Sequence, residues 1–470
     1  TRGCPFTCTF CWEGGSYFTK TPRYPQDRIV EELEYIAKRA KTRDLQITDA
    51  NFGMFPKDIE TAKSIKKCQE KHAGYPATVL AATAKTGKER TVEIVKILGP
   101  TLPATAAVQS TDKTVLSEIK RKNVSQEVLV NFSKSIEKEG GQSEAEIILC
   151  LEGDTKEKHF KTVKDMLDAD MKFIRLYQFM MLPGTKSTTN ESRKKWEYIC
   201  RYRVLPRCFG EYTFRGTKFP VAEIEEICVA NKTMPYEDYQ ACRKFDLTVE
   251  IFNNDSILAD LMSFLRMNNI KRSELIEKIH EISLLHPVFS KFYEEFNAEE
   301  KKNLATDPKP LEKFTKQKGV IKKYIDGEYG TNELYKYRAI AVFRHIKELH
   351  EIAYEAAKFL LKENNLLDEK VGTYLSELFD FSILRKNNCL DVSNKQKKTF
   401  HFDFGKIIES HFQINPFDVY NPNGVETNLS HTKEQVGLIK TYENQYGTDL
   451  IGLGRILLRA NMDRLYLSVE

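Results

Sequence analysis

Three cysteines stand close together at the beginning of the chain. The first eleven residues read TRGCPFTCTFC, which places Cys4, Cys8 and Cys11 at C-x3-C-x2-C spacing. Thiolates this close on a loop can converge on one metal centre, and cubane iron–sulfur clusters are held by such thiolates, usually four of them. Three ligands leave one iron of a cluster open, and an open iron can bind and activate a substrate or a cofactor.

The same segment resembles the signature of radical S-adenosylmethionine (SAM) enzymes, C-x3-C-x-aromatic-C, with Phe10 as the aromatic residue. The string RGCPFTC resembles the branch of this superfamily that contains a cobalamin-binding (B12-binding) domain. The resemblance implies a [4Fe–4S] cluster bound by Cys4, Cys8 and Cys11, with SAM chelating the fourth iron. A one-electron reductant such as flavodoxin or ferredoxin would then drive SAM cleavage to a 5′-deoxyadenosyl radical, which abstracts hydrogen from a substrate.

Other interpretations of the cysteines stay open. The trio could hold zinc with a distant fourth ligand, or remain unliganded. Zinc sites usually show paired C-x2-4-C knuckles, whereas the chain has one C-x2-C pair, Cys8 and Cys11. A zinc-stabilised module that binds nucleic acid or protein is therefore an alternative of a different class. Four later cysteines suggest an auxiliary cluster but match no metal motif, so buried thiols are the simpler interpretation: Cys200, Cys208, Cys228 and Cys242.

Composition sets limits on the class of protein. The chain has 470 residues, enough for two or three domains, with 41% hydrophobic and 30% charged residues. The net charge of +5 comes from 72 basic and 67 acidic side chains, a small excess that does not favour a nucleic-acid partner. The sequence shows no apolar run of about 18 residues and no signal peptide. Its ten scattered cysteines are typical of reduced thiols, so we expect a cytoplasmic protein without a membrane partner.

Residues 26–203 alternate between helical and strand patterns. Strands are predicted at 45–48, 77–81, 104–108, 146–149 and 173–177, with a final helix over about 190–203. Such alternation predicts an α/β fold, a parallel sheet with helices outside it. Counting residues 1–3 as the end of a first strand gives six units, which matches the partial (βα)6 barrel that the resemblance implies.

Three regions are predicted from these patterns. They are a radical SAM partial barrel over 1–215, an acidic connector over 216–254 and a mainly helical C-terminal domain over 255–470. The chain begins almost on the cysteine loop, so we expect a fragment of a longer protein with most of the first strand upstream. A cobalamin domain in that missing part is a further expectation from the resemblance.

Polar residues at strand ends are the candidate cofactor ligands, because chemistry in such barrels lies at the carboxyl ends of the strands. Asp49 and Asn51 follow the second strand, where many family members have a Gly-Gly-Glu that contacts SAM. The resemblance implies that Gln109 and Ser110 face the ribose and that Arg121 binds the SAM carboxylate with two parallel hydrogen bonds. Alternatively, Asp49 merely ends its strand and Arg121 lies on a solvated helix end.

The substrate side of the site is less defined. Tyr177 and Trp12 are expected to line the cavity for a small molecule or biosynthetic intermediate, with Tyr177 and Phe10 among the cofactor-binding residues. Two reactions compete within the family: cobalamin-assisted methylation or rearrangement, and methylthiolation. Methylthiotransferases share the Gln109-Ser110 pair and a loop like that at 182–185, but the helical pattern of the tail counts against them.

Overall fold

The computed structural model describes residues 2–139 and 141–470. The chain divides into two compact units. Unit 1 contains the residues up to Arg203 together with Ile224–Cys242 and Ala305–Pro308. Unit 2 contains Val204–Glu223, Arg243–Leu304 and Lys309–Glu470. Thr1, part of the predicted strand end over residues 1–3, lies outside the described residues, and Arg2 and Gly3 are not in a strand.

Unit 1 contains parallel strands, as the alternating pattern predicts. Strand β1 (Asp44–Phe52) pairs with β2 (Thr78–Thr83), and a second sheet has the order β3 (Ala104–Gln109), β4 (Ser143–Leu149), β5 (Phe173–Gln178). The predicted α/β fold with parallel strands is therefore confirmed. The six-unit barrel is not, because the described strands form two parallel sheets rather than one continuous ladder.

Side chains connect the two sheets where β2 approaches β3. The hydroxyl of Thr83 donates to the carbonyl of Thr105 (2.5 Å) and accepts from its backbone N–H (3.0 Å). The ammonium group of Lys88 donates to the carbonyls of Ala84 (2.8 Å) and Thr105 (3.1 Å). Burial lowers the pKa of Lys88 to about 8. Between β2 and β3, these side-chain hydrogen bonds therefore replace the backbone hydrogen bonds of a continuous sheet.

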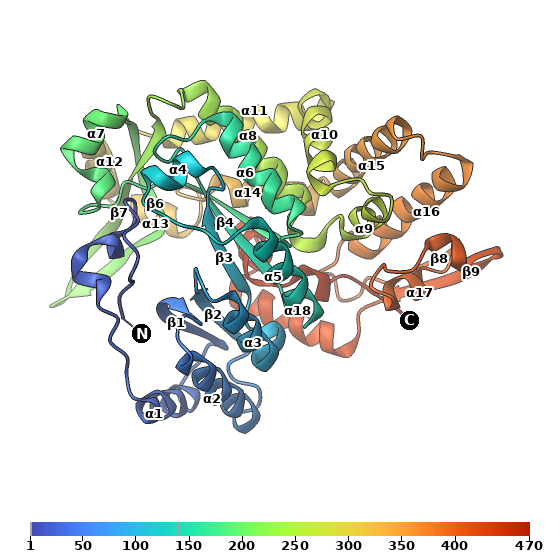
Figure 1. The fold of residues 1–470 in the computed structure, drawn as a ribbon, viewed down its shortest axis with the longest axis horizontal. Helices are drawn as coiled ribbons and strands as arrows, with labels where there is room; N and C mark the ends of the chain where they lie inside the picture. Colours follow the sequence, from blue (N-terminus) through green and yellow to red (C-terminus); the bar gives the residue numbers. More distant parts are fainter. Residues whose placement is uncertain (1, 140) are drawn as a thin grey trace. The chain divides into compact units, whose positions relative to one another are not determined.

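Helices follow the strands of unit 1. They are α1 (Gln26–Ala37), α2 (Lys57–Lys71), α3 (Lys88–Leu98), α4 (Lys113–Glu118), α5 (Gln126–Lys138), α6 (Lys156–Asp168) and α7 (Asn190–Trp196). Short 3-10 segments lie at Trp12–Gly14, Ser16–Thr19, Gly99–Thr101 and Lys186–Thr188. Helices α2, α3 and α5 pack in series, and α5 and α6 pack against β4 (Figure 1).

Local sequence explains how these helices begin and which face they bury. The side chain of Asp112 caps α4, and the hydroxyls of Ser125 and Thr155 cap α5 and α6. Helix α5 buries Leu129 and Phe132 at helical spacing, which is the pattern of a helix lying on a core.

The predicted helix over 190–203 is wrong in its second half. Helix α7 ends at Trp196, and Glu197 adopts a left-handed conformation (φ 53°) that closes it. The chain then forms strand β6 (Ile199–Phe214), which pairs with β7 (Thr217–Ala230) across a turn with positive φ at Arg215 and Gly216. The segment 216–254 contains β7 and helix α8 (Tyr236–Phe252).

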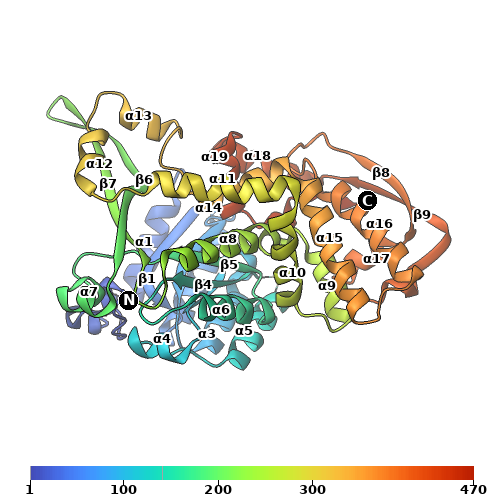
Figure 2. The same cartoon turned by 90° about the horizontal axis from the view of Figure 1, so that it is seen from above.

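Unit 2 is mainly helical. Its helices are α9 (Ala259–Met267), α10 (Arg272–Leu285), α11 (Pro287–Asn303), α12 (Pro308–Thr315), α13 (Val320–Ile325), α14 (Glu333–Arg344), α15 (Ile346–Glu363), α16 (Glu369–Lys386), α17 (Phe404–Glu409), α18 (Lys433–Tyr446) and α19 (Leu450–Arg459). Short 3-10 segments lie at Asn254–Ser256, Pro416–Val419 and Met462–Arg464. Helices α10, α15 and α16 pack in series, and α19 packs against α14 and α18 (Figure 2).

A small antiparallel sheet completes unit 2. Its order is β10 (Ser468–Val469), β9 (Tyr420–Ser430), β8 (Gln396–Phe402), and β8 covers the alternating segment from Thr399 that the sequence suggested as a strand. The outer half of the β6–β7 hairpin also belongs to unit 2, where Val204 packs with Val320 and Tyr324. Among the described residues, no helix combines the length and apolar character needed to cross a membrane.

Candidate metal centre and cofactor site

The cysteine loop follows a tight path that two glycines permit. Gly3 has φ +84°, and a Cβ there would lie 2.3 Å from the carbonyl oxygen of Phe18. A Cβ on Gly14 would lie 2.2 Å from the carbonyl oxygen of Cys8. The backbone N–H of Cys4 donates to the carbonyl of Phe18 (2.8 Å). Because a side chain at either glycine would push the backbones apart, these glycines fix the loop around Cys4 and Cys8.

Thr9 anchors the loop to three other parts of unit 1. Its backbone N–H donates to the carbonyl of Ile119 after α4 (3.1 Å), and its carbonyl accepts from the backbone N–H of Ser187 (3.1 Å). The hydroxyls of Thr9 and Ser187 both donate to one carboxylate oxygen of the buried Glu152. Glu152 therefore ties the loop to the turn that follows β4.

Three polar side chains, two from strand ends and one from just after α4, surround the sulfur atoms of Cys4 and Cys8. The amide nitrogen of Asn51 is 3.2 Å from the sulfur of Cys4. The ammonium nitrogen of Lys85 lies 3.8 Å from the sulfur of Cys4 and 3.9 Å from that of Cys8. A guanidinium nitrogen of Arg121 lies 3.9 Å from the sulfur of Cys8. The two sulfur atoms thus face two cations and an amide donor.

The sulfur atoms are not arranged around a single point. In the part of the chain that the structure describes, no group of three His, Cys, Asp or Glu side chains could hold one metal ion. In a cubane cluster each thiolate binds its own iron, so three ligands of a cluster need not meet at one ion. Cys4 and Cys8 are buried and Cys11 is partly exposed. Burial raises the pKa of Cys11, while the backbone N–H of Glu13 and the charge of Lys85 lower it.

Buried polar atoms with no hydrogen-bond partner test whether this site suits a ligand. Within residues 2–139 and 141–470, such atoms include the amide oxygens of Asn51 and Gln109 and the second carboxylate oxygen of Glu152. Leaving a buried acceptor without a donor costs about 1–3 kcal/mol. Asn51 and Glu152 both contact the cysteine loop, and Gln109 ends β3 in a left-handed conformation (φ 66°). The residues present therefore fit a polar cofactor beside the loop.

Asp49 and Ser110 have local partners. A carboxylate oxygen of Asp49 accepts the backbone N–H of Asn51 (2.9 Å), which shapes the end of β1. The hydroxyl of Ser110 lies 3.3 Å from that of Thr162 and accepts the backbone N–H of Asp112 (3.2 Å). Both side chains are buried and stabilise strand ends, so their contribution to a ligand site comes through Asn51 and the loop after β3.

Arg121 is buried beside Cys8 rather than on a solvated helix end. Its guanidinium donates to the side chain of Asn123 (2.9 Å) and to the carbonyl of Ala107. Burial lowers its pKa, and the nearby thiols of Cys8 and Cys4 act in the opposite direction. A buried guanidinium held against a thiol has the charge needed to stabilise an anionic ligand there.

The predicted aromatic residues differ in their surroundings. Phe10 is half-buried within the loop, while Trp12 and Tyr177 are 55% and 40% exposed. Trp12 packs against Phe18 with ring centroids 4.6 Å apart, and Gly184 approaches its indole edge. The structure therefore places the 182–185 loop beside the residue that follows the cysteine motif.

Two residues of this site were not singled out from sequence as ligands. Lys85 comes two residues after the end of β2, so the rule that sites lie at the carboxyl ends of parallel strands could have identified it. Glu152 follows β4 in the same way, at a position where the sequence only indicated a departure from the family pattern. Its role depends on Thr9 and Ser187, which are 143 and 35 residues away in sequence.

The later cysteines do not form the auxiliary group suggested by their order in sequence. The sulfur of Cys228 lies 3.7 Å from that of Cys150, and a guanidinium nitrogen of Arg193 lies 3.8 Å from that of Cys200. Burial raises the pKa of Cys228, and contact with Cys228 raises that of Cys200. Cys208 is exposed in the part of β6 that belongs to unit 2. The raised pKa values of Cys200 and Cys228 keep these two thiols protonated.

The region that contains the cysteine loop is similar to a known family. Residues 1–184 match the model of the radical SAM superfamily. The cobalamin-dependent radical SAM methyltransferase TokK of Streptomyces tokunonensis is 28% identical over 277 residues, which cover 57% of this chain and 39% of that protein. A 2-(S-pantetheinyl)-carbapenam-3-carboxylate methyltransferase of Streptantibioticus cattleyicolor is 28% identical over 279 residues, with the same coverage.

A solved structure is also similar to part of the chain. The radical SAM methyltransferase TsrM of Kitasatospora setae is 15% identical, and the match covers 46% of this chain and 40% of that one with a TM-score of 0.36. The chain spans 39% of the length of the curated relatives that it matches.

Proposed function

We propose, on the premise that residues 1–184 belong to the radical SAM superfamily and form an enzyme domain, that Cys4, Cys8 and Cys11 bind a [4Fe–4S] cluster and that the chain cleaves SAM reductively. The observation that carries this proposal is the set of polar groups around the thiols. Asn51 from the end of β1, Lys85 from just after β2 and Arg121 from just after α4 meet at Cys4 and Cys8. A packed core would not need two cations there.

The chain's own residues have distinct parts in this proposal. Asn51 donates an N–H to Cys4, and Lys85 and Arg121 provide positive charge beside the sulfur atoms that would bind the cluster. The amide oxygens of Asn51 and Gln109, which lack partners among the described residues, remain to accept hydrogen bonds from the amine and hydroxyl groups of SAM. When bound, the cluster supplies the electron that cleaves SAM to methionine and a 5′-deoxyadenosyl radical.

Arg121 has a second part in the proposal. Its buried guanidinium orients the SAM carboxylate, because a planar fork of N–H donors matches a carboxylate. Three further residues support the site indirectly in this proposal. Asp49 shapes the end of β1, Ser110 shapes the end of β3, and Phe10 is part of the cysteine loop. Tyr177 and Trp12 are both exposed, and in this proposal they contact the substrate. The two sheets of unit 1 would then line one partial (βα)6 barrel.

The reaction that we propose is cobalamin-assisted methylation of a small molecule. Both curated relatives are methyltransferases, and the name of one states that it depends on cobalamin and radical SAM chemistry. This favours methylation over methylthiolation, and the superfamily match favours an iron–sulfur cluster over zinc. Cobalamin would be held by a part of the protein outside residues 1–470, and a flavodoxin- or ferredoxin-type donor would supply electrons.

The cluster is tested by metal analysis and SAM cleavage in the natural protein that contains this chain. After anaerobic reconstitution, we expect iron with acid-labile sulfide and formation of 5′-deoxyadenosine on reduction. Cys4→Ala should abolish 5′-deoxyadenosine formation, whereas the matched control Cys68→Ala, a buried cysteine of α2, should retain it. Full activity of Cys4→Ala, or zinc without iron, would contradict the proposal.

The cobalamin step has its own test. The same protein, incubated with SAM and reduced cobalamin, should form methylcobalamin, which absorption spectroscopy detects. Because this readout needs no substrate, it separates the reaction class from the unknown substrate. SAM cleavage without any methylcobalamin would leave the radical SAM assignment intact and contradict cobalamin-assisted methylation.

A further inference from the structure

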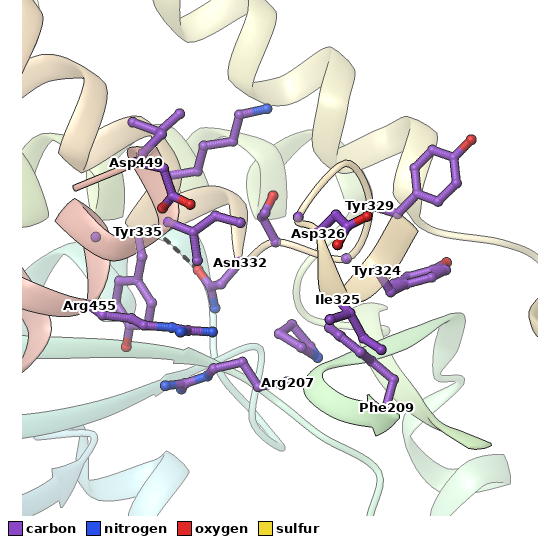
Figure 3. Close-up of a pocket in the computed structure, with 18 of the residues that line it drawn as sticks. Arg207, Phe209, Tyr324, Ile325, Asp326, Tyr329, Asn332, Tyr335, Asp449 and Arg455 are labelled. Carbon is purple, nitrogen blue, oxygen red and sulfur yellow. Dashed lines mark hydrogen bonds between the residues drawn. The ribbon is translucent and has the colours of Figure 1, made fainter. Parts of the chain in front are cut away.

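Unit 2 contains a cavity that has no part in the function proposed above. Its volume is about 470 Å³, within the range of small-molecule sites. Three segments of unit 2 line it: the outer half of β6, residues 324–336 and the first turns of α19 (Figure 3).

One side of the cavity is aromatic. The ring of Tyr324 lies 5.3 Å from that of Phe209 and 5.5 Å from that of Tyr329, measured between ring centroids. Pro206 and Ile325 add apolar surface next to these rings. Tilted aromatic rings lining a cavity form a surface on which a planar molecule can pack.

Three of the charged groups that line the cavity already have partners. The carboxylate of Asp326 pairs with Lys322 (2.9 Å), and a carboxylate oxygen of Asp449 caps α19 by accepting the backbone N–H of Gly452 (2.7 Å). The ammonium group of Lys336 pairs with Glu299 (2.7 Å). Asp326 and Lys336 are therefore balanced by counter-ions, whereas Asp449 keeps one negative charge at the start of α19.

Arg207 and Arg455 differ from these three groups. In the described chain, neither guanidinium has a carboxylate or carbonyl partner, and both line the cavity. Figure 3 shows the two side chains coming from β6 and α19 and pointing toward one another below Asn332. The amide oxygen of Asn332 accepts the backbone N–H of Tyr335 (3.2 Å), so its amide N–H groups remain as further donors. Two unpaired guanidinium groups beside an amide donor form a site for an anion.

The backbone around this cavity is held in unusual conformations. Arg207 has φ +68° although it lies within a strand and is not a glycine. Gly330 has φ +66°, and a Cβ there would lie 2.4 Å from the ring of Tyr324. Left-handed residues other than glycine persist where the surrounding structure enforces them, and they cluster at ligand sites. Here the left-handed Arg207 projects its guanidinium from the hairpin toward the cavity.

We propose that this cavity binds a planar small molecule that carries a carboxylate or a phosphate. Arg207, Arg455 and the amide of Asn332 hold the anionic group, and the rings of Phe209 and Tyr324 pack against the planar part. The ligand needs both an anionic group and a planar part to contact all of these residues, because the cationic residues and the aromatic residues lie on different sides of the same cavity. The proposal rests on unit 2 alone and is independent of the cluster in unit 1.

Calorimetric titration of the whole chain with a series of naphthalenes tests both halves of this site. The probes are 1-naphthyl phosphate, 1-naphthoate and the neutral 1-naphthalenemethanol, so the ring stays constant while the anionic group changes. We expect both anions to bind, and the neutral compound to bind at least about tenfold more weakly. The tighter of the two anions identifies the ligand as a phosphate or a carboxylate.

Variants connect this affinity to the named residues. Arg455→Gln and Arg207→Gln should each weaken binding of the anionic probes about tenfold or more, because each removes a charge-assisted contact. Arg459→Gln is the matched control, an exposed arginine on the same helix that does not line the cavity. Phe209→Leu should weaken all three probes by a similar factor, since it removes a ring but keeps apolar volume.

Three outcomes would overturn the proposal. They are the absence of binding by either anion at about 1 mM, equal affinity for the neutral probe, and a loss in Arg455→Gln no larger than in Arg459→Gln. Thermal unfolding of each variant shows whether it is folded, and Arg207→Gln provides the same test if Arg455→Gln is not.

Discussion

Buried charge in unit 2 and buried polar groups around the cysteine loop are satisfied to different degrees. In unit 2 the ammonium group of Lys386 donates to Asp260, to the hydroxyl of Ser382 and to the carbonyl of Ile257, each at 2.8 Å. All three donors of this lysine are used. A buried charge that is completely paired in this way has no capacity left for a ligand, so its role is structural.

The cysteine loop shows the opposite pattern. Asn51, Gln109 and Glu152 are equally buried, yet each leaves one oxygen atom without a hydrogen bond in the described part of the chain. Burial alone therefore does not distinguish a structural polar residue from a functional one. Atoms without a partner also occur in unit 2, on Asn297 and His431 for example, so their number alone does not make this distinction either. The cysteine loop differs because two of the residues with such atoms, Asn51 and Glu152, contact the loop itself.

Breaking the closed network of unit 2 should have the largest effect on stability. Lys386→Met leaves the carboxylate of Asp260 buried without its counter-ion, which costs about 3–5 kcal/mol. Urea denaturation measures this loss. Lys398→Met is the matched control, because Lys398 forms an exposed pair with Asp380 that contributes about 1 kcal/mol or less. A similar loss in both variants would mean that the buried network has no special role.

Removing the carboxylate that anchors the cysteine loop should have the next largest effect. Glu152→Ala leaves the hydroxyls of Thr9 and Ser187 without their acceptor, at about 1–3 kcal/mol for each buried group. We expect faster loss of iron to a chelator than in the unmodified protein. Glu152→Gln keeps one acceptor oxygen and should hold iron better than Glu152→Ala. Equal iron loss in both variants would show that the hydrogen bonds of Glu152 do not position the loop.

The turn after β4 should give unit 1 a stability that depends on pH. Burial raises the pKa of Asp154 to about 6, above the value of about 3.9 in an unfolded chain. Between these values the folded state keeps a proton that the unfolded state releases, so stability falls as pH rises from about 4 to 6, by roughly 1–3 kcal/mol. His159 and Lys158 face this carboxylate and reduce the effect by favouring its charged form.

Comparison of the natural protein with Asp154→Asn isolates this effect. The variant mimics the protonated form, so its free energy of unfolding should exceed that of the unmodified protein by more at pH 7 than at pH 4.5. A difference that stays constant between these two pH values would contradict the raised pKa.

The smallest expected effect concerns the N–H that Asn51 donates to Cys4. Hydrogen bonds to the sulfur ligands help to set the potential of an iron–sulfur cluster. Asn51→Leu removes one such bond, of about 0.5–1.5 kcal/mol, and should give a more negative midpoint potential in an electron paramagnetic resonance titration. Ser64→Leu, a change on α2 away from the loop, should leave the potential unchanged. An unchanged potential in Asn51→Leu would show that this amide does not bond to a cluster ligand.

The sequence predicts the parts of this molecule that depend on local pattern. The strands of unit 1 follow from apolar runs that alternate with amphipathic helices, and the cysteine loop follows from spacing. The hairpin from Ile199 to Ala230 was missed, because its first residues continue the apparent helix of α7 and the break at Glu197 is a conformational feature. The local sequence pattern does not show where α7 ends and β6 begins, because β6 is stabilised by pairing with β7, which comes later in the chain.

For the candidate site too, the sequence predicted the residues that belong to a local pattern but not the contacts between distant residues. Cys4, Asn51 and Arg121 could be singled out, since each belongs to a motif or a strand end. Lys85 and Glu152 also follow strand ends, so the strand-end rule could have included them, but their contacts with the cysteine loop could not be predicted because those partners lie far away in sequence. Pairing between distant residues is a property of the fold, which spacing along the chain does not contain.

The division of the chain has a consequence for how the protein is made. The chain passes between the two units five times, after Arg203, Glu223, Cys242, Leu304 and Pro308. The polypeptide of unit 1 is therefore complete only when Pro308 has left the ribosome, about 5–20 s after Arg203 at ordinary rates of synthesis. Strand β6 waits for β7 only until Ala230, about 1–5 s after Arg203, and a nascent chain that stalls there would expose an unpaired strand edge to aggregation or proteolysis.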